Sequence, residues 1–339
     1  MKIWLCFASM ILAFLGTLLL RRYALAKQII DVPNARSSHT VPTPRGGGVA
    51  IVLAFLLILT GWFLYGDMAT DLFWALLPGG ALVAIVGFWD DHSSLSAKLR
   101  FSFHLLAAAW AVFCLGGWPS LDLGFTSFAW GWFGAGVAGL ALAWAINLYN
   151  FMDGIDGLAG MQAVFVGGAG GALLWLAGAD GMPLFLLAAA STGFLLLNWP
   201  PARIFMGDAG SGFLGYSFGV MALHATALGT TAIWPWTILL GVFLVDATLT
   251  LVRRGLRGIR VTDAHRTHAY QWASRRLGAH KPVTLSVLLI NIFLLLPLAL
   301  ASMVWPLWAL LFAGLSLAAL IWLAWRFDAG LPESDKINA

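Results

Sequence analysis

The stretch IWLCFASMILAFLGTLLL, residues Ile3–Leu20, is long and apolar enough to cross a bilayer as a single helix. Arg21 and Arg22 follow it directly and only Lys2 precedes it, which is the reverse of the charge bias of a secretory signal peptide. We therefore predict a permanent membrane helix here, with its N-terminus on the outer side.

Apolar segments of similar length recur along the rest of the chain. Of the 339 residues, 60% are hydrophobic and only 10% are Asp, Glu, Lys or Arg, a balance that excludes a soluble globular domain. The sequence predicts an all-α polytopic membrane protein of about eleven transmembrane helices; only Pro306 and its flanking tryptophans divide the last two, so about ten is the alternative. The spans are expected at residues 3–20, 46–65, 72–89, 102–118, 132–149, 160–177, 182–198, 211–227, 233–252, 283–303 and 305–325.

The charges predict the orientation of these spans. The odd-numbered spans all end on the same side of the membrane, and every basic residue except Lys2 lies on that side. By the positive-inside rule, this side is the cytoplasmic face. The net charge of +4 therefore reports topology, and no nucleic-acid partner is expected. The predicted outer loops carry only Asp67, Asp71, Asp122 and Asp180 as charges. The predicted cytoplasmic loops are residues 21–45, 90–101, 150–159, 199–210 and 253–282.

Two neighbouring acids, Asp90 and Asp91, end the third predicted span. Adjacent carboxylates are unfavourable at a helix C-terminus, because the helix dipole already places negative charge there. A cation should offset them, either Lys98 and Arg100 in the same loop or a metal ion. The alternative is an ordinary solvated start of a loop.

Side-chain oxygens recur every three residues in the next inner loop, at Asn147, Asn150, Asp153 and Asp156. Hard divalent cations such as Mg²⁺ take carboxylate and amide oxygens of this kind. A simple polar turn between two helices is the alternative, but such a turn needs fewer of these groups.

A third acid, Asp208, lies in the stretch FMGDAGSG at residues 205–212, where one span gives way to the next. Taken alone, it is as well explained as a helix N-cap or a complement to the helix dipole. Three acidic loops on one face nevertheless favour a shared functional site. The glycine-rich helix start could also present backbone N–H groups to phosphate.

Basic residues suited to phosphate lie in two further inner loops. The largest loop contains His265, Arg266 and His268; Arg side chains bind phosphate oxygens bidentately, and His can donate hydrogen bonds. The first loop contains Arg45 in the stretch PTPRGGG at residues 42–48, which could contact a diphosphate or serve only to shape the loop. Asp246, inside the ninth span, is costly unless paired, and either a structural or a site role stays open for it.

Together these loops resemble the polyprenyl-phosphate N-acetylhexosamine-1-phosphate transferase family. The resemblance rests on five motifs in the family's order, and the form HRTHAYQ at residues 265–271 is closest to the O-antigen-initiating bacterial branch. This form departs from the His-rich run of the phospho-muramoyl-pentapeptide translocase and the teichoic-acid enzymes. The motifs are residues 42–48, Asp90 with Asp91, Asn150 with 153–158, 207–211 and 265–271.

The resemblance implies an Mg²⁺-dependent enzyme, with Mn²⁺ as an alternative metal. It would transfer a sugar-1-phosphate from a UDP-sugar to polyprenyl phosphate in the bacterial cytoplasmic membrane, release UMP and start a lipid-linked cell-surface polysaccharide. A homodimer is left open. The implied catalytic residues are Asp90, Asp91 and Asp208, with Asp90 as the candidate base. The implied metal ligands are Asn150 and Asp208, and the implied substrate-binding residues are Arg45, Lys98, Arg100, Asn147, Asp153, Asp156, His265, Arg266 and His268.

A transporter and an intramembrane aspartyl protease are the alternative functions for a chain of this composition. A transporter should bind its substrate near the bilayer midplane, whereas these acids lie at the ends of spans. An intramembrane aspartyl protease would pair two acids, but here further carboxylate and amide oxygens favour a metal.

Overall fold

The computed structural model describes residues 3–33, 41–66, 68–117, 120–260 and 265–332. Within them the chain is almost entirely helical, with two short antiparallel strand pairs. The elements are α1 (Ile3–Ala26), β1 (Ile30–Asp31), β2 (Thr43–Pro44), α2 (Gly48–Leu64), α3 (Thr70–Ser93), α4 (Ala97–Cys114), β3 (Leu121–Asp122), β4 (Ser127–Phe128), α5 (Gly131–Phe151), α6 (Leu158–Leu176), α7 (Met182–Asn198), α8 (Asp208–Ala227), α9 (Ile233–Leu239), α10 (Gly241–Leu256), α11 (Ala269–Leu277), α12 (His280–Ile290), a π-helical turn (Asn291–Leu295), α13 (Leu296–Val304), a 3₁₀ turn (Pro306–Trp308) and α14 (Ala309–Arg326).

The all-α membrane architecture is confirmed, because each predicted span coincides with helical structure. Seven helical segments in the described chain are long and apolar enough to cross a bilayer, and α2 and α7 are shorter apolar helices. The last two predicted spans are separate helices that part near Trp305. The exact number of crossings stays a prediction.

Three boundaries differ from the sequence-based expectation. The ninth span is not one helix: it breaks at Leu240 into α9 and α10. The acids Asp90 and Asp91 still belong to α3, which runs on to Ser93. The inner loop predicted at residues 253–282 contains the amphipathic helix α11.

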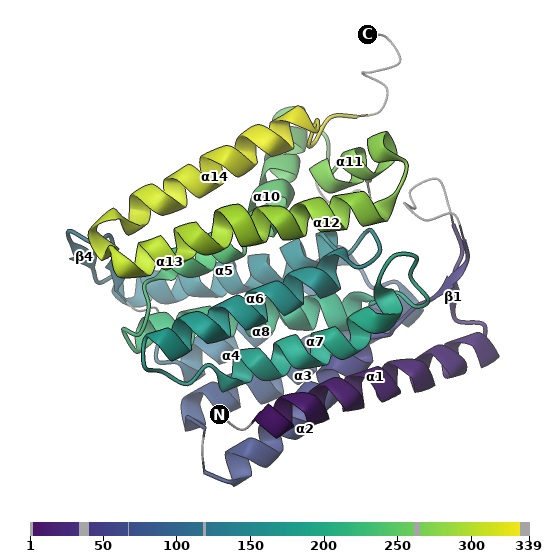
Figure 1. The fold of residues 1–339 in the computed structure, drawn as a ribbon, viewed down its shortest axis with the longest axis horizontal. Coiled ribbons are helices and arrows are strands. Elements are labelled where there is room, and N and C mark those ends of the chain that lie inside the picture. The colour runs from purple at the N-terminus through teal and green to yellow at the C-terminus, as the bar shows by residue number, and fades with distance from the viewer. Residues whose placement is uncertain (1–2, 34–40, 67, 118–119, 261–264, 333–339) are drawn as a thin grey trace.

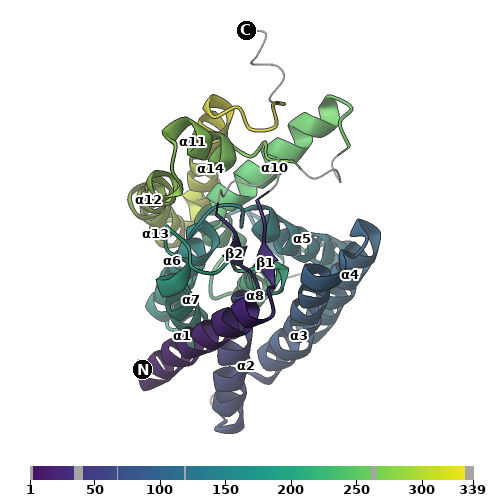
Figure 2. The same cartoon turned by 90° about the vertical axis from the view of Figure 1, so that its right-hand side faces the viewer.

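Helix α8 lies at the centre of the bundle, surrounded by α2, α3 and α5 (Figure 2). Most of its residues are buried, and its glycines let neighbouring backbones approach closely, as small residues do in membrane bundles. A Cβ atom on Gly210 would lie 2.6 Å from the Cα of Gly48, and one on Gly87 would lie 2.5 Å from the backbone nitrogen of Ala209. The N-terminus of α8 is therefore packed backbone to backbone between α2 and α3.

The polar segments gather at one end of the bundle. In Figure 1 the strand β1 and the helix α11 lie at the right-hand end, whereas β4 lies at the opposite end. The end with β1 and α11 is the one that the charges predict to be cytoplasmic, and it contains the candidate site.

Candidate active site

Asp208 is the first residue of α8, directly after Gly207, whose φ of 80° is in the left-handed region that glycine tolerates best. The backbone N–H of Asp208 donates to both carboxylate oxygens of Asp91, at 3.2 and 3.1 Å. Asp91 therefore caps this helix from α3, and the side chain of Asp208 is left for other contacts. The interpretation of Asp208 as an ordinary N-cap does not describe this geometry.

Two arginines hold the three acids together. Arg45 places one Nη2 atom 2.5 Å from Asp208 and 2.8 Å from Asp91. Arg100 pairs with Asp90 and lies 3.5 Å from the second oxygen of Asp208. The side chains of Asp90, Asp91 and Asp208 are only 9%, 5% and 16% exposed, whereas those of Arg45 and Arg100 are each 36% exposed, so water screens these ion pairs in part.

Arg45 reaches this cluster because its loop is tied to the segment before α8. The N–H groups of Gly46 and Gly47 donate to the carbonyl of Phe205, and the N–H of Phe205 donates to the carbonyl of Pro44. Burial by itself would lower the pKa of Arg45, but the nearby Asp208 and Asp91 outweigh it and raise that pKa. The guanidinium is thus permanently charged where it meets the carboxylates.

Arg100, and not Lys98, supplies the cation expected beside Asp90. Both residues lie on α4, but two positions on a helix differ by about 200°, so they face opposite sides. Lys98 is exposed to solvent and lies away from the acid cluster. A second contact stabilises the acid: the backbone N–H of Leu95 donates to Asp90 at 2.6 Å.

The loop after α5 forms one wall of a pocket of about 270 Å³. Asn150 donates through Nδ2 to Ser211 of α8, at 3.2 Å. Asp156 accepts from the N–H of Ala202 and faces the His280 ring at 3.2 Å. The pocket also contains Arg45, Asp153 and Asp208, so it brings together five of the predicted site residues.

Acidic side chains outnumber basic ones in and around the pocket. Burial raises the pKa of Asp153 well above its usual value; Arg45 lowers this pKa, but the neighbouring Asp208, Asp91 and Asp156 raise it further. Burial also raises the pKa of Asp208. The predicted residues place five carboxylates, those of Asp90, Asp91, Asp153, Asp156 and Asp208, near two guanidinium groups, those of Arg45 and Arg100.

A hard divalent cation fits this donor set. Asp208 and Asn150 both line the pocket and offer a carboxylate and an amide oxygen. No group of three His, Cys, Asp or Glu side chains in the described part of the chain could hold a metal on its own. Mg²⁺ commonly binds through one or two carboxylates and completes its shell with water and substrate phosphates, so the small donor set suits it.

The remaining predicted residues lie outside the pocket. Asn147 faces α4, where its Nδ2 lies 3.2 Å from His104. The His268 ring is buried and lies 3.3 Å from Asp246. Burial, followed by His268 and Arg254, lowers the pKa of His265 to about 3, so this ring is neutral. Arg266 is partly exposed, and its carbonyl accepts from Arg275.

Asp246 is a structural partner of α11. Its carboxylate accepts hydrogen bonds from the N–H groups of Ala269 and Tyr270, at 2.9 and 3.0 Å, and so caps the helix from α10. Thr250 also donates to it, at 3.2 Å. This pairing explains how an acid inside the ninth predicted span can remain buried.

The sequence did not single out five other residues that line the pocket. They come from β1, α7, the segment before α8, α11 and α12, and only the fold brings them together. Only for Gln271 does the local sequence offer a clue: it follows His268 by three residues, the spacing of a capping box, and the two form one at the start of α11. These residues are Asp31, Asn198, Phe205, Gln271 and His280.

Comparison with known proteins gives a family match over the part of the chain that contains Asp208. The model of glycosyl transferase family 4 matches residues 73–226, which run from α3 through Asp208 into α8. The chain is 31% identical to the "Probable undecaprenyl-phosphate N-acetylglucosaminyl 1-phosphate transferase" of Bacillus subtilis (strain 168), over 77% of this chain and 74% of the relative. It is 30% identical to the undecaprenyl-phosphate alpha-N-acetylglucosaminyl 1-phosphate transferase of Yersinia pestis, over 75% and 72%. It is 29% identical to the decaprenyl-phosphate N-acetylglucosaminephosphotransferase of Mycobacterium leprae, over 82% and 78%.

Proposed function

The chain belongs to the polyprenyl-phosphate N-acetylhexosamine-1-phosphate transferases of glycosyl transferase family 4, and from this premise we propose how it acts. It transfers a sugar-1-phosphate to polyprenyl phosphate. We propose that the donor is UDP-N-acetylglucosamine and that UMP is the second product. The observation that carries the proposal is the Asp208 carboxylate, held between Arg45 and Arg100 in a polar pocket at one end of a membrane bundle.

A second pocket supports a donor as large as a UDP-sugar. It measures about 610 Å³ and shares Asp156, Phe205 and His280 with the first, so the two pockets adjoin. Arg275 and Lys281 line its outer part and suit the phosphates of an incoming nucleotide. Together the two pockets offer more room than the 270 Å³ around Asp208 alone.

Neutralisation of phosphate oxygens is the main task of this site. Phosphoryl transfer depends chiefly on positioning and on stabilising negative charge. Arg45 and Arg100 already lie beside the acids. Their guanidinium groups can donate hydrogen bonds to phosphate oxygens when substrates enter. We propose that Asp208 and Asn150 hold Mg²⁺, which when bound would neutralise the diphosphate and stabilise the leaving UMP.

Asp90 is better suited to orientation than to proton removal. Its carboxylate pairs with Arg100 and accepts from Leu95, so both of its oxygens are engaged. The acceptor phosphate has a second pKa of about 6 and is largely dianionic at neutral pH, so it needs no strong base. We therefore propose that Asp90 holds Arg100 in position beside the acceptor phosphate.

We propose that the site faces the cytoplasm of a bacterial inner membrane, with the N-terminus in the periplasm. The basic residues at this end of the bundle and the acidic outer loops support that orientation. Reporters fused after Lys98 and after Arg257 are expected to be cytoplasmic, and one fused near Asp122 external. A shared location for all three reporters would contradict the charge argument.

The reaction is tested by turnover of the purified protein in detergent. UDP-N-acetylglucosamine, undecaprenyl phosphate and Mg²⁺ should give a lipid-linked sugar and UMP in equal amounts, and chelation of the metal should stop both. A transporter would release neither product, and an aspartyl protease would not need the metal. Equal turnover with and without chelator would contradict the proposed magnesium site.

A further inference from the structure

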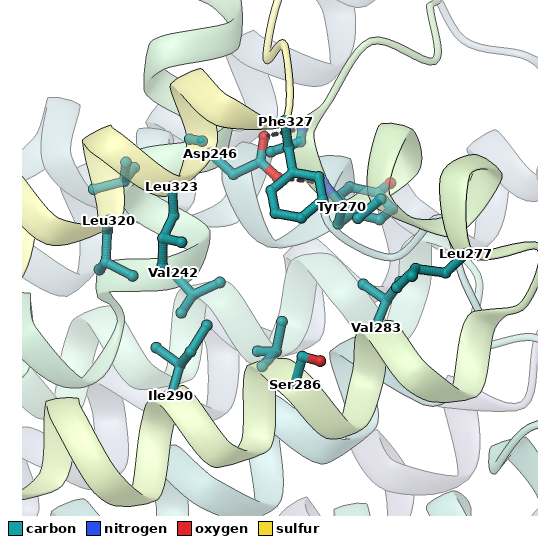
Figure 3. A pocket seen from close by; sticks show the side chains of 15 residues that line it. Val242, Asp246, Tyr270, Leu277, Val283, Ser286, Ile290, Leu320, Leu323 and Phe327 are labelled. Atoms are coloured by element: carbon teal, nitrogen blue, oxygen red, sulfur yellow. Dashed lines mark hydrogen bonds between the residues drawn. The ribbon is translucent and has the colours of Figure 1, made fainter.

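An apolar cavity lies beside α11, on the side away from the catalytic pocket. It has a volume of about 120 Å³, and α10, α12 and α14 supply its walls (Figure 3). Val242 lines it from α10, Val283 and Ile290 from α12, and Leu320 and Leu323 from α14. In Figure 1, α14 and the α12–α13 segment converge at the end near β4, and α11 lies beyond α12 at the other end. We call this cavity the α12–α14 wedge.

The wedge is not an extension of the catalytic pocket. Helix α11 separates them: Tyr270 and Leu277 line the wedge, whereas Gln271 lines the catalytic pocket. The carboxylate of Asp246 lies at the inner end of the wedge, but both of its oxygens already accept hydrogen bonds from α11. Its occupant must therefore be apolar, since water is poorly held in a cavity with apolar walls.

The mouth of the wedge is open at the surface of the helix bundle. Leu277 is 54% exposed although it lines the cavity, and Ser286 is also exposed at its edge. The segments His280–Val304 and Pro306–Arg326 are both long and apolar enough to cross a bilayer. A hydrocarbon chain of a membrane lipid can therefore enter from the side and bury its surface against the valines and leucines.

Three arginines surround the polar end of the wedge, around the C-terminus of α14. Arg276 lies 5.7 Å from the ring of Phe327, a residue that lines the cavity, and it pairs with Asp328. Arg253 donates to the carbonyl of Ala329, and the side chain of Arg326 is exposed. Around the C-terminus of α14, the three arginine charges thus outnumber the carboxylates of Asp246 and Asp328.

We propose that the α12–α14 wedge binds a phospholipid with an anionic headgroup, distinct from the polyprenyl phosphate acceptor. A short stretch of one acyl chain enters the apolar cavity of about 120 Å³ while the rest of the chain stays in the bilayer, and the headgroup phosphate lies among Arg253, Arg276 and Arg326. Arginine forks suit phosphate oxygens, and basic residues near the inner face of a membrane attract anionic lipids. The bound lipid would pack against α11 and stabilise its position. Gln271 lies on this helix and lines the catalytic pocket.

The test uses the full-length protein in phosphatidylcholine nanodiscs that contain a small fraction of phosphatidylglycerol with a photoreactive acyl chain. Cross-links are expected on α12 and α14. Ser286→Trp fills the mouth of the wedge and should abolish these cross-links. Leu285→Trp adds the same side chain at the neighbouring position, which does not line the wedge, and should leave them unchanged. Thermal unfolding of both variants checks that they are folded.

The headgroup is tested separately with surface substitutions that leave the cavity intact. Arg326→Gln should weaken the preference for phosphatidylglycerol over phosphatidylcholine about fivefold, the effect of about one basic residue near an anionic surface. Arg22→Gln, an exposed arginine at the end of α1, should leave the preference unchanged. Equal labelling of all variants by photoreactive phosphatidylglycerol and, in a parallel reaction, by photoreactive phosphatidylcholine would mean only nonspecific lipid contact and would overturn the proposal. Competition by undecaprenyl phosphate would also overturn it, because the wedge would then hold the acceptor chain.

Discussion

Asp208→Asn is expected to lower turnover by about 10²- to 10³-fold, the same scale as the loss of one electrostatic group from other active sites, because Asp208 positions the cations that meet the phosphates. Asp208 is the acid that both Arg45 and Arg100 contact, and it is one of the two proposed magnesium ligands. The substitution keeps the shape of the side chain. It also leaves intact the cap on α8, because Asp91 accepts the backbone N–H of residue 208. The protein should therefore still insert in the membrane and unfold at nearly the same temperature.

The matched control for this experiment is Asp71→Asn. Asp71 also lies in the first turn of a membrane helix, α3, but its partner is His224 and not the acid cluster. This variant should keep turnover within about twofold, because surface substitutions away from special features have small effects. Near-normal turnover of Asp208→Asn at limiting magnesium would remove Asp208 from the site.

Gly87→Ala is expected to lower turnover by about 10²-fold, through a displacement of the helix that carries Asp208. A Cβ atom at residue 87 would lie 2.5 Å from the backbone of Asp208 and Ala209, so α3 and α8 must separate to make room for it. The same shift moves Asp90 and Asp91 away from Asp208. Overpacking of this kind costs about 1–3 kcal/mol, so the melting temperature should also fall.

Gly61→Ala is the control for the glycine experiment. Gly61 is also inside a membrane helix, α2, but a Cβ atom there would meet no other atom within 4 Å. Alanine favours a helix over glycine, so this variant should be at least as stable as the parent protein and fully active. Unchanged turnover of Gly87→Ala would contradict the close packing of α3 on α8 as the basis of the site.

Most of the fold could be predicted because hydropathy alone marks membrane helices. The break at Leu240 could not, since the residues on either side of it, 238–245, are all apolar or glycine and hydropathy marks no boundary there. Helix α11 was also missed. Its apolar face appears only in a nine-residue amphipathic segment, Ala269–Leu277, and Asp246 caps it from another helix.

The acidic centre of the site could be predicted because chemistry requires a cation beside paired carboxylates. That argument identified Arg100 but could not separate it from Lys98, since the choice depends on which side of α4 each residue faces. His280 and Asn198 could not be predicted. Each is a single polar residue at the end of a helix, and only the packing of α7 and α12 around the loop after α5 brings them to the pocket.

In the proposed reaction an oxygen of polyprenyl phosphate attacks the phosphorus next to the sugar, and the bond from that phosphorus to the bridging oxygen breaks to release UMP; the anomeric carbon of the sugar is not attacked. The most direct measurement uses a UDP-N-acetylglucosamine labelled in the phosphate next to the sugar, incubated with undecaprenyl phosphate and Mg²⁺. Because the acids and arginines converge on a site suited to a diphosphate, the label should move into the organic-extractable lipid product and leave unlabelled UMP in water. Label found in aqueous UDP, while the sugar moves to the lipid, would contradict this account.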